Sequence, residues 1–131
     1  MTSPNKIVVS TPNAPAAIGP YSQAIKAGGF VFTSGVIPLD PATGDIAGAE
    51  IVAQTERVMA NLTAVLDAAG STLSHVVKTT CFLQNLGDFA AFNQVYAQSF
   101  ASEPPARSTV EVAKLPRGVL VEIEAVALIA E

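Results

Sequence analysis

The chain has 131 residues, half of them apolar and only 14% charged, and its formal net charge is −4. This length predicts a single domain over residues 1–131, and the seven scattered lysines and arginines offer no basic patch for nucleic acid. The mean hydropathy is +0.42, yet no apolar run approaches the ~20 residues of a membrane span, which argues against a membrane protein and favours a subunit interface.

The first third of the chain predicts three strands joined by turns. Residues 6–10 read as a short strand, and residues 13–21 form a loop punctuated by proline and glycine. Residues 22–27 and 30–35 predict a hairpin, because the Gly28-Gly29 pair between them supplies the backbone freedom of a tight turn.

Two helices and a strand follow. Apolar side chains recur every three or four positions over residues 50–69, which predicts an amphipathic helix that ends at Gly70. Residues 88–100 predict a second helix with one aromatic side. Residues 76–83, between the helices, predict a strand covered on both faces. Its expected faces are Val76, Thr80 and Phe82 on one side and Val77, Thr79, Cys81 and Leu83 on the other.

Two further strands are predicted at residues 108–112 and 119–129, after a loop over residues 102–107. The element order predicts an α+β fold in which two helices pack on one face of a single mixed β-sheet. In the last strand the face that carries Glu122 and Glu124 is otherwise apolar. Because the chain has no third layer to cover this face, we expect another subunit to do so.

Arg107 and Glu122 are the main candidates for chemistry. Each lies in or beside an apolar strand, where an ionised group without a partner is costly. On neighbouring strands, the guanidinium could bind a small anion while the carboxylate activates a water. The alternatives are an ion pair between the two, a capping hydrogen bond for Arg107 and a solvated edge position for Glu122. Glu124 is an equally possible working carboxylate.

Other reactive side chains favour structural roles. His75 suits the surface or the start of a strand, and Cys81 suits a buried thiol. Ser34 lacks the His and Asp of a serine hydrolase, and Tyr21 suits either turn packing or a site. A single cysteine excludes an internal disulfide and fits a cytoplasmic protein.

We expect no metal or cofactor, because one histidine and one cysteine cannot build a zinc site and no nucleotide-binding motif occurs. Residues 1–6 lack the apolar region of a secretory signal, so we expect none.

Many ordered segments together resemble the reactive-intermediate deaminase family (RidA/YjgF). They are NAPAAIGPYSQA at 13–24, TSGVIP at 33–38, VKTTCFL at 77–83, Asp88-Phe89 with Asn93 and Tyr96, PARSTV at 105–110, and Leu115-Pro116 followed by VEIEA at 121–125. The resemblance covers nearly the whole chain. It implies a chorismate-mutase-like α+β fold and a homotrimer whose sheets form a central barrel, with clefts between the subunits.

The resemblance also implies an activity: cofactor-independent hydrolysis of 2-imino acids, such as 2-iminobutanoate and 2-iminopropanoate or its enamine 2-aminoacrylate, to 2-oxo acids and ammonia. Arg107 matches the arginine that binds the substrate carboxylate, and Glu122 matches the carboxylate that positions water. The matching cleft-lining positions are Tyr21, Ser34, Gly35, Asn93 and Thr109. A non-catalytic carboxylate-binding module, or a chaperone-like member, is the alternative.

Three positions depart from the family pattern. Thr109 stands where many members carry cysteine, so a thiol has no role at this position. Asn85 replaces a frequent aspartate, and Phe92 replaces a smaller aliphatic side chain. These two changes bear on the volume of the pocket rather than on the chemistry.

Overall fold

The structure is a computed structural model that describes residues 5–130. The expectation about a signal at residues 1–6 therefore falls mostly outside the described residues. The elements in chain order are β1 (Ile7–Val9), β2 (Ala24–Ala27), β3 (Phe30–Thr33), α1 (Ile51–Ala68), β4 (Val76–Leu83), α2 (Phe89–Ser99), β5 (Ala106–Glu111) and β6 (Val121–Leu128). This order and the predicted α+β class are confirmed.

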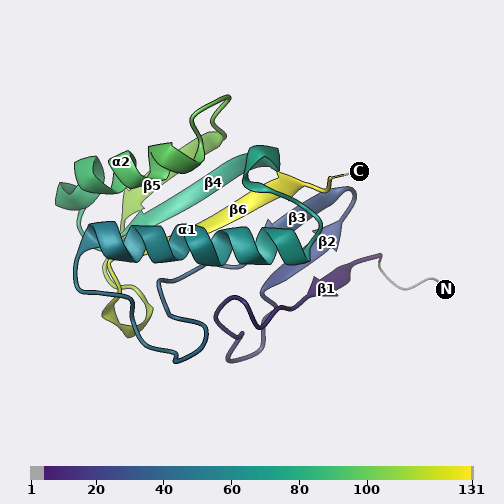
Figure 1. The fold of residues 1–131 in the computed structure, drawn as a ribbon, viewed down its shortest axis with the longest axis horizontal. Coiled ribbons are helices and arrows are strands. Elements are labelled where there is room, and N and C mark those ends of the chain that lie inside the picture. Colours follow the sequence, from purple (N-terminus) through teal and green to yellow (C-terminus); the bar gives the residue numbers. More distant parts are fainter. Residues whose placement is uncertain (1–4, 131) are drawn as a thin grey trace.

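The strands form one mixed six-stranded sheet in the order β1-β2-β3-β6-β4-β5. Only β4 and β5 pair in parallel, and α2 makes the crossover that a parallel connection requires. Figure 1 shows α1 and α2 on the same side of the sheet, with both termini at the end nearest β1 and β2. The predicted hairpin is also present, since Ala27 pairs with Phe30 and both intervening glycines have positive φ.

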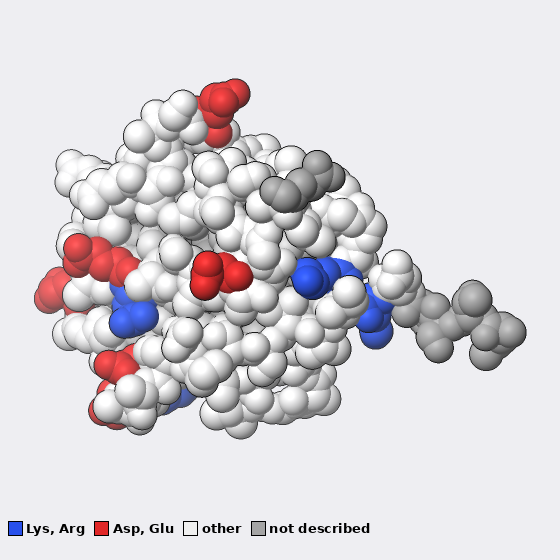
Figure 2. All heavy atoms as spheres, turned by 45° about the vertical axis from the view of Figure 1, so that its right-hand side comes forward, with Lys and Arg blue, Asp and Glu red and all other residues white. Residues whose placement is uncertain are grey.

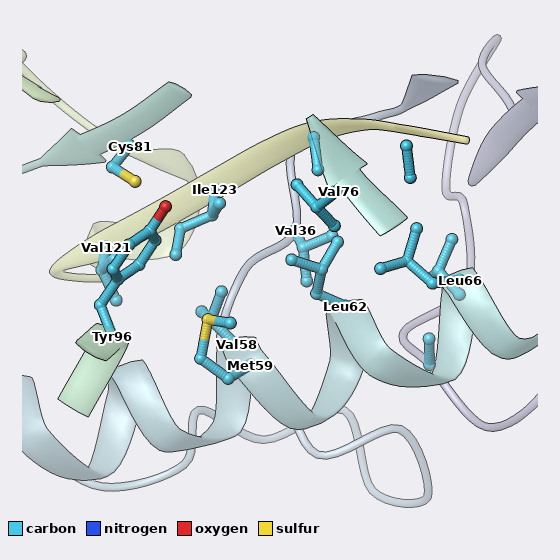
Figure 3. Close-up of a cluster of buried hydrophobic side chains, with 14 of the residues drawn as sticks. Val36, Val58, Met59, Leu62, Leu66, Val76, Cys81, Tyr96, Val121 and Ile123 are labelled. Atoms are coloured by element: carbon cyan, nitrogen blue, oxygen red, sulfur yellow. The ribbon is translucent and has the colours of Figure 1, made fainter. Parts of the chain in front are cut away.

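α1 covers the sheet with the apolar stripe that its sequence predicted. Val58, Leu62 and Leu66 are fully buried and pack with Val36 and Ile123 in the core (Figure 3). The same helix also buries three polar side chains, those of Gln54, Thr55 and Asn61. Asn61 donates to the carbonyls of Ile37 and Leu39, and Gln54 accepts from the amide of Leu120. α1 therefore anchors both the segment after β3 and the start of β6.

β4 contains an irregularity that the alternating pattern did not predict. Val76 pairs with Ala127 and Lys78 pairs with Val126, so one residue of β4, Val77, has no partner on β6. This bulge places Val76 in the core and leaves Val77 40% exposed. The predicted faces of β4 are therefore wrong at these two positions, although the rest of the strand alternates as expected.

Two strand boundaries also differ from prediction. β5 begins at Ala106, directly after Pro105, so Arg107 is a strand residue rather than the end of a loop. β6 begins at Val121, because the amide of Leu120 donates to the side chain of Gln54 instead of to a neighbouring strand. In both cases a neighbouring element, which the local pattern does not reveal, decides where pairing starts.

The face of the sheet opposite the helices is apolar and uncovered in the single chain. We call it the open face; Glu122 and Glu124 lie on it, as predicted. Three of its apolar side chains are 42–45% exposed: Phe32, Val110 and Leu128. Side chains of this size are normally buried in strands, so their exposure indicates a contact surface, which Lys78 and Ser108 share with them. Within residues 5–130 no helix is long and apolar enough to cross a membrane.

Candidate active site

Arg107 lies on the edge strand β5 and faces α2. It pairs with Thr79, which is fully buried, so its side chain points to the helix side of the sheet. One guanidinium nitrogen, Nη1, donates to Oδ1 of Asn93 at 2.7 Å. The guanidinium carbon lies 4.7 Å from the ring centre of Tyr96 and 5.4 Å from that of Phe89. These contacts hold the guanidinium between a strand and a helix.

A pocket of about 400 Å³ opens beside Arg107, lined by Asn93, Tyr96, Ala97, Phe100, Pro104, Pro105 and Arg107. Thr109 lies two residues along the same strand and therefore on the same face as Arg107. Its hydroxyl oxygen is buried. Thr109 lies beside Cys81, since a hydrogen bond from Thr109 partly offsets the burial that raises the pKa of the Cys81 thiol.

Glu122 lies on the open face, where it pairs with Phe82 across β6 and β4. Its carboxylate packs against the α-carbon of Gly35, since a methyl group on that carbon would overlap the carboxylate. Burial raises the pKa of the Glu122 carboxyl, and the charge of Glu124 raises it further. Glu122 is thus a half-buried carboxyl that holds its proton more tightly than an exposed glutamate, as a tuned general base does.

Tyr21, Ser34 and Gly35 line a second pocket of about 300 Å³, together with apolar residues of the loop before β2 and with Arg117. Ser34 is fixed, because its hydroxyl donates to the carbonyl of Gln23 at 3.1 Å. Gln23 is itself buried, and its side chain bonds the backbone of Thr11 and Pro15. The structure therefore brings Tyr21, Ser34 and Gly35 to one pocket, and Glu122 adjoins this group at Gly35.

The expectation that Arg107 and Glu122 lie on neighbouring strands is wrong. β4 separates β5 from β6 in the sheet, and the two side chains point to opposite faces. One chain can therefore neither join them in an ion pair nor place one ligand between them. The candidate residues fall into two groups, an arginine half with Arg107, Asn93 and Thr109, and a carboxylate half with Glu122, Gly35, Ser34 and Tyr21.

His75 and Cys81 line neither pocket. Cys81 is fully buried in β4, and burial raises the pKa of its thiol to about 11. Nδ1 of His75 lies 2.6 Å from the hydroxyl of Thr72 in the turn before β4. Within residues 5–130, no group of three or more His, Cys, Asp and Glu side chains is placed to hold a metal ion.

Sequence reasoning missed the aromatic surroundings of Arg107. The sequence predicted a helix with one aromatic side, but it did not predict that Phe89 and Tyr96 of this helix lie against the guanidinium. One signal in the sequence could have pointed to these contacts. Arg107 lies beside an apolar strand, where a cation needs a partner, and no acidic residue nearby in the sequence was an obvious one. Arg117 was also missed. It lines the second pocket and donates to the carbonyl of Gly44, and no spacing in the sequence pointed to either contact.

Comparison with known proteins gives one family, whose members carry different names. Residues 11–129 match the family described as Endoribonuclease L-PSP. A RutC family protein of Pyrococcus horikoshii is 53% identical over 122 residues, which cover 93% of this chain and 97% of that protein. Reactive Intermediate Deaminase A, chloroplastic, of Arabidopsis thaliana is 50% identical over 126 residues, covering 96% of this chain and 67% of that protein.

A solved structure extends the similarity to the fold. The crystal structure of E. coli TdcF with bound serine superposes with a TM-score of 0.90 at 42% identity, covering 95% of this chain and 99% of that one. The sheet and helices described above are therefore shared with a protein whose structure holds an amino acid.

Proposed function

The chain belongs to the Endoribonuclease L-PSP family, and from this membership and the site geometry we propose that it is a deaminase of reactive 2-imino acids. Its substrates would be 2-iminobutanoate and 2-iminopropanoate, the latter in equilibrium with 2-aminoacrylate. Water adds its oxygen to the imine carbon, the carbon–nitrogen bond breaks, and a 2-oxo acid and ammonia are released. A relative named as a reactive intermediate deaminase supports this reaction class.

Each half of the site would have its own task. Arg107 would bind the substrate carboxylate, since a planar guanidinium can form two parallel hydrogen bonds to it. Glu122 would orient the attacking water and accept its proton. Tyr21, Ser34, Gly35 and Thr109 would line the cleft.

The two halves would meet between copies of the chain. Arg107 and Glu122 lie on opposite faces of one sheet, so a site that needs both requires two copies. A homotrimer, in which the open faces form the inside of a barrel, would also bury the exposed Phe32, Val110 and Leu128. The apolar open face supports this assembly independently of the chemistry.

Glu122 is the feature that favours an enzyme over a binding module. A carboxylate beside an anionic ligand weakens binding by repulsion, so a pure carboxylate binder gains nothing from it. A base that handles a water, in contrast, benefits from the raised pKa that burial gives Glu122. The second candidate, a non-catalytic carboxylate-binding module, is favoured by the serine bound in the TdcF structure.

The family description also names an endoribonuclease. On the face drawn in Figure 2, basic side chains lie at separate places rather than in one continuous patch. A net charge of −4 likewise gives RNA little attraction. We therefore make deamination the proposal and RNA cleavage an outcome that the assays must exclude.

A coupled assay tests the proposal. A threonine dehydratase supplies 2-iminobutanoate, and the release of 2-oxobutanoate is followed with and without this protein. We expect faster release with the wild-type chain, and no acceleration with Glu122→Gln while that variant still binds 2-oxobutanoate. If the wild-type chain binds 2-oxobutanoate but does not accelerate its release from 2-iminobutanoate, the binding module is favoured. Cleavage of a single-stranded RNA by the metal-free protein would favour the endoribonuclease.

A further inference from the structure

Arg107 is held by partners that carry no charge. Oδ1 of Asn93 accepts its hydrogen bond at 2.7 Å, and the rings of Tyr96, Phe89 and Phe92 lie 4.7, 5.4 and 6.0 Å from the guanidinium carbon. An amide oxygen and aromatic faces attract a cation, but they do not neutralise it. The guanidinium therefore keeps its full charge at the mouth of a pocket.

The neutral partners are themselves firmly placed. Phe92 is fully buried, and the hydroxyl of Tyr96 lies 2.7 Å from that of Thr79, which is also fully buried. Figure 3 shows Tyr96 reaching from α2 towards the sheet beside Cys81. Asn93 lies on α2 between these two aromatic residues. The orientation of the guanidinium is thus set by a helix that is anchored in the core rather than by a loop.

We propose that Asn93 is a positioning residue that orients Arg107 without neutralising it, and that the neutral amide keeps Arg107 available to an incoming carboxylate. This inference rests on the proposed function, because it assigns the acceptor of that carboxylate. An aspartate at the same position would be of nearly equal size and would bind Arg107 more strongly. It would then compete with the substrate carboxylate for the same donors and repel it.

The test compares Asn93→Asp with the wild-type chain, using 2-oxobutanoate as the probe. We expect the affinity for 2-oxobutanoate, measured by titration calorimetry, to fall on the order of a hundredfold. KM for 2-iminobutanoate should rise in parallel. The melting temperature should stay the same or rise, because the new carboxylate pairs with Arg107. If Asn93 has only a structural role, the folded Asn93→Asp variant should bind 2-oxobutanoate as tightly as the wild type does, and that result would overturn the proposal.

Asn85→Asp is the matched control, since it makes the same chemical change eight residues earlier in the chain. Asn85 lines neither pocket in the structure, so the expectation that it bears on the volume of the pocket is wrong. Oδ1 of Asn85 accepts from the amide of Gly87, and a carboxylate can do the same. We expect this variant to bind 2-oxobutanoate as the wild type does. An equal loss in both variants would show a general effect of added charge and would overturn the proposal.

A second variant, Asn93→Ala, serves if Asn93→Asp does not fold. It removes the orienting bond and leaves the guanidinium charged, so KM should rise about tenfold with a smaller change in kcat. Unchanged KM in the folded variant overturns the inference. Failure of the proposed function can be told apart from failure of this inference. If the wild type binds 2-oxobutanoate but does not deaminate 2-iminobutanoate, only the proposed enzyme activity is wrong. The affinities of the variants for 2-oxobutanoate then still test the role of Asn93. A wild type that binds no carboxylate overturns both.

Discussion

The two faces of the sheet are both apolar, but the chain covers only one of them. On the helix side Val31, Ile123 and Ala127 are completely buried. On the open face Phe32 and Leu128, which belong to the same strands β3 and β6, remain more than 40% exposed. The difference teaches that alternation along a strand shows which faces are apolar, but not which of them the described part of the chain covers.

The same division separates the arginine half of the candidate site from the carboxylate half. Arg107 faces α2 and is surrounded by contacts within its own chain, whereas Glu122 faces outward beside Gly35. The arginine half contains no carboxylate, and the cation that lines the pocket of the carboxylate half, Arg117, donates to the carbonyl of Gly44. The predictions below test whether the halves have the different tasks that we assign to them.

The largest effect is expected from Arg107→Lys, which keeps the charge and removes the planar fork. A lysine offers a point charge on a flexible stem, and a misplacement of the imine by ~1 Å costs on the order of a hundredfold in rate. Deaminase activity should therefore collapse while the melting temperature changes little. Steady-state kinetics and thermal unfolding on the same preparation measure both. Near-normal turnover in a stable variant would contradict the role of Arg107 as the carboxylate binder.

A smaller loss is expected from Gly35→Ala. The added methyl group overlaps the Glu122 carboxylate, which is the end of a flexible side chain and can move away. We expect turnover to fall roughly tenfold with little change in stability, because only the position of the base is altered. The double variant with Glu122→Gln should lose no more activity than Glu122→Gln alone. Additive losses would show that Gly35 acts independently of Glu122.

The smallest effect is a shift in pH dependence. Burial and Glu124 raise the pKa of Glu122 above its ordinary value of 4.5, so the ionised base should appear, and activity should rise, above that pH. Because the folded chain holds this proton more tightly than the unfolded chain, Glu122 also lowers stability as pH rises through the same range. Glu124→Gln should move the rising limb of the pH–rate profile to lower pH. A limb that does not move would exclude electrostatic coupling between the two carboxyls.

Local patterns predicted the elements of this fold well and their spatial order poorly. The stripe on α1 was correct because helical periodicity depends only on residues of one segment. The position of Arg107 relative to Glu122 was wrong because β4 pairs between β5 and β6, and strand order depends on contacts between distant segments. The bulge at Val77 was missed for the same reason, since only the partner strand shows which residue of β4 is extra.

The sequence supplied candidate site residues, which stay predictions, but it did not show how they are arranged. Arg107 and Glu122 were conspicuous as charges in apolar strands, and the family resemblance supplied Tyr21, Ser34, Gly35, Asn93 and Thr109. The pattern could not show that these residues form two separate halves, because that depends on which face of the sheet each side chain occupies.

Mixing two inactive variants tests the central claim, that one site needs Arg107 from one copy and Glu122 from another. Arg107→Lys and Glu122→Gln are unfolded together, refolded as a mixture and assayed for deamination against each variant refolded alone. With random assembly, about a quarter of the sites should receive an intact arginine from one copy and an intact glutamate from its neighbour, so about a quarter of wild-type activity should return. Activity no higher than that of the separate variants, in a mixture shown to form mixed oligomers, would contradict the account.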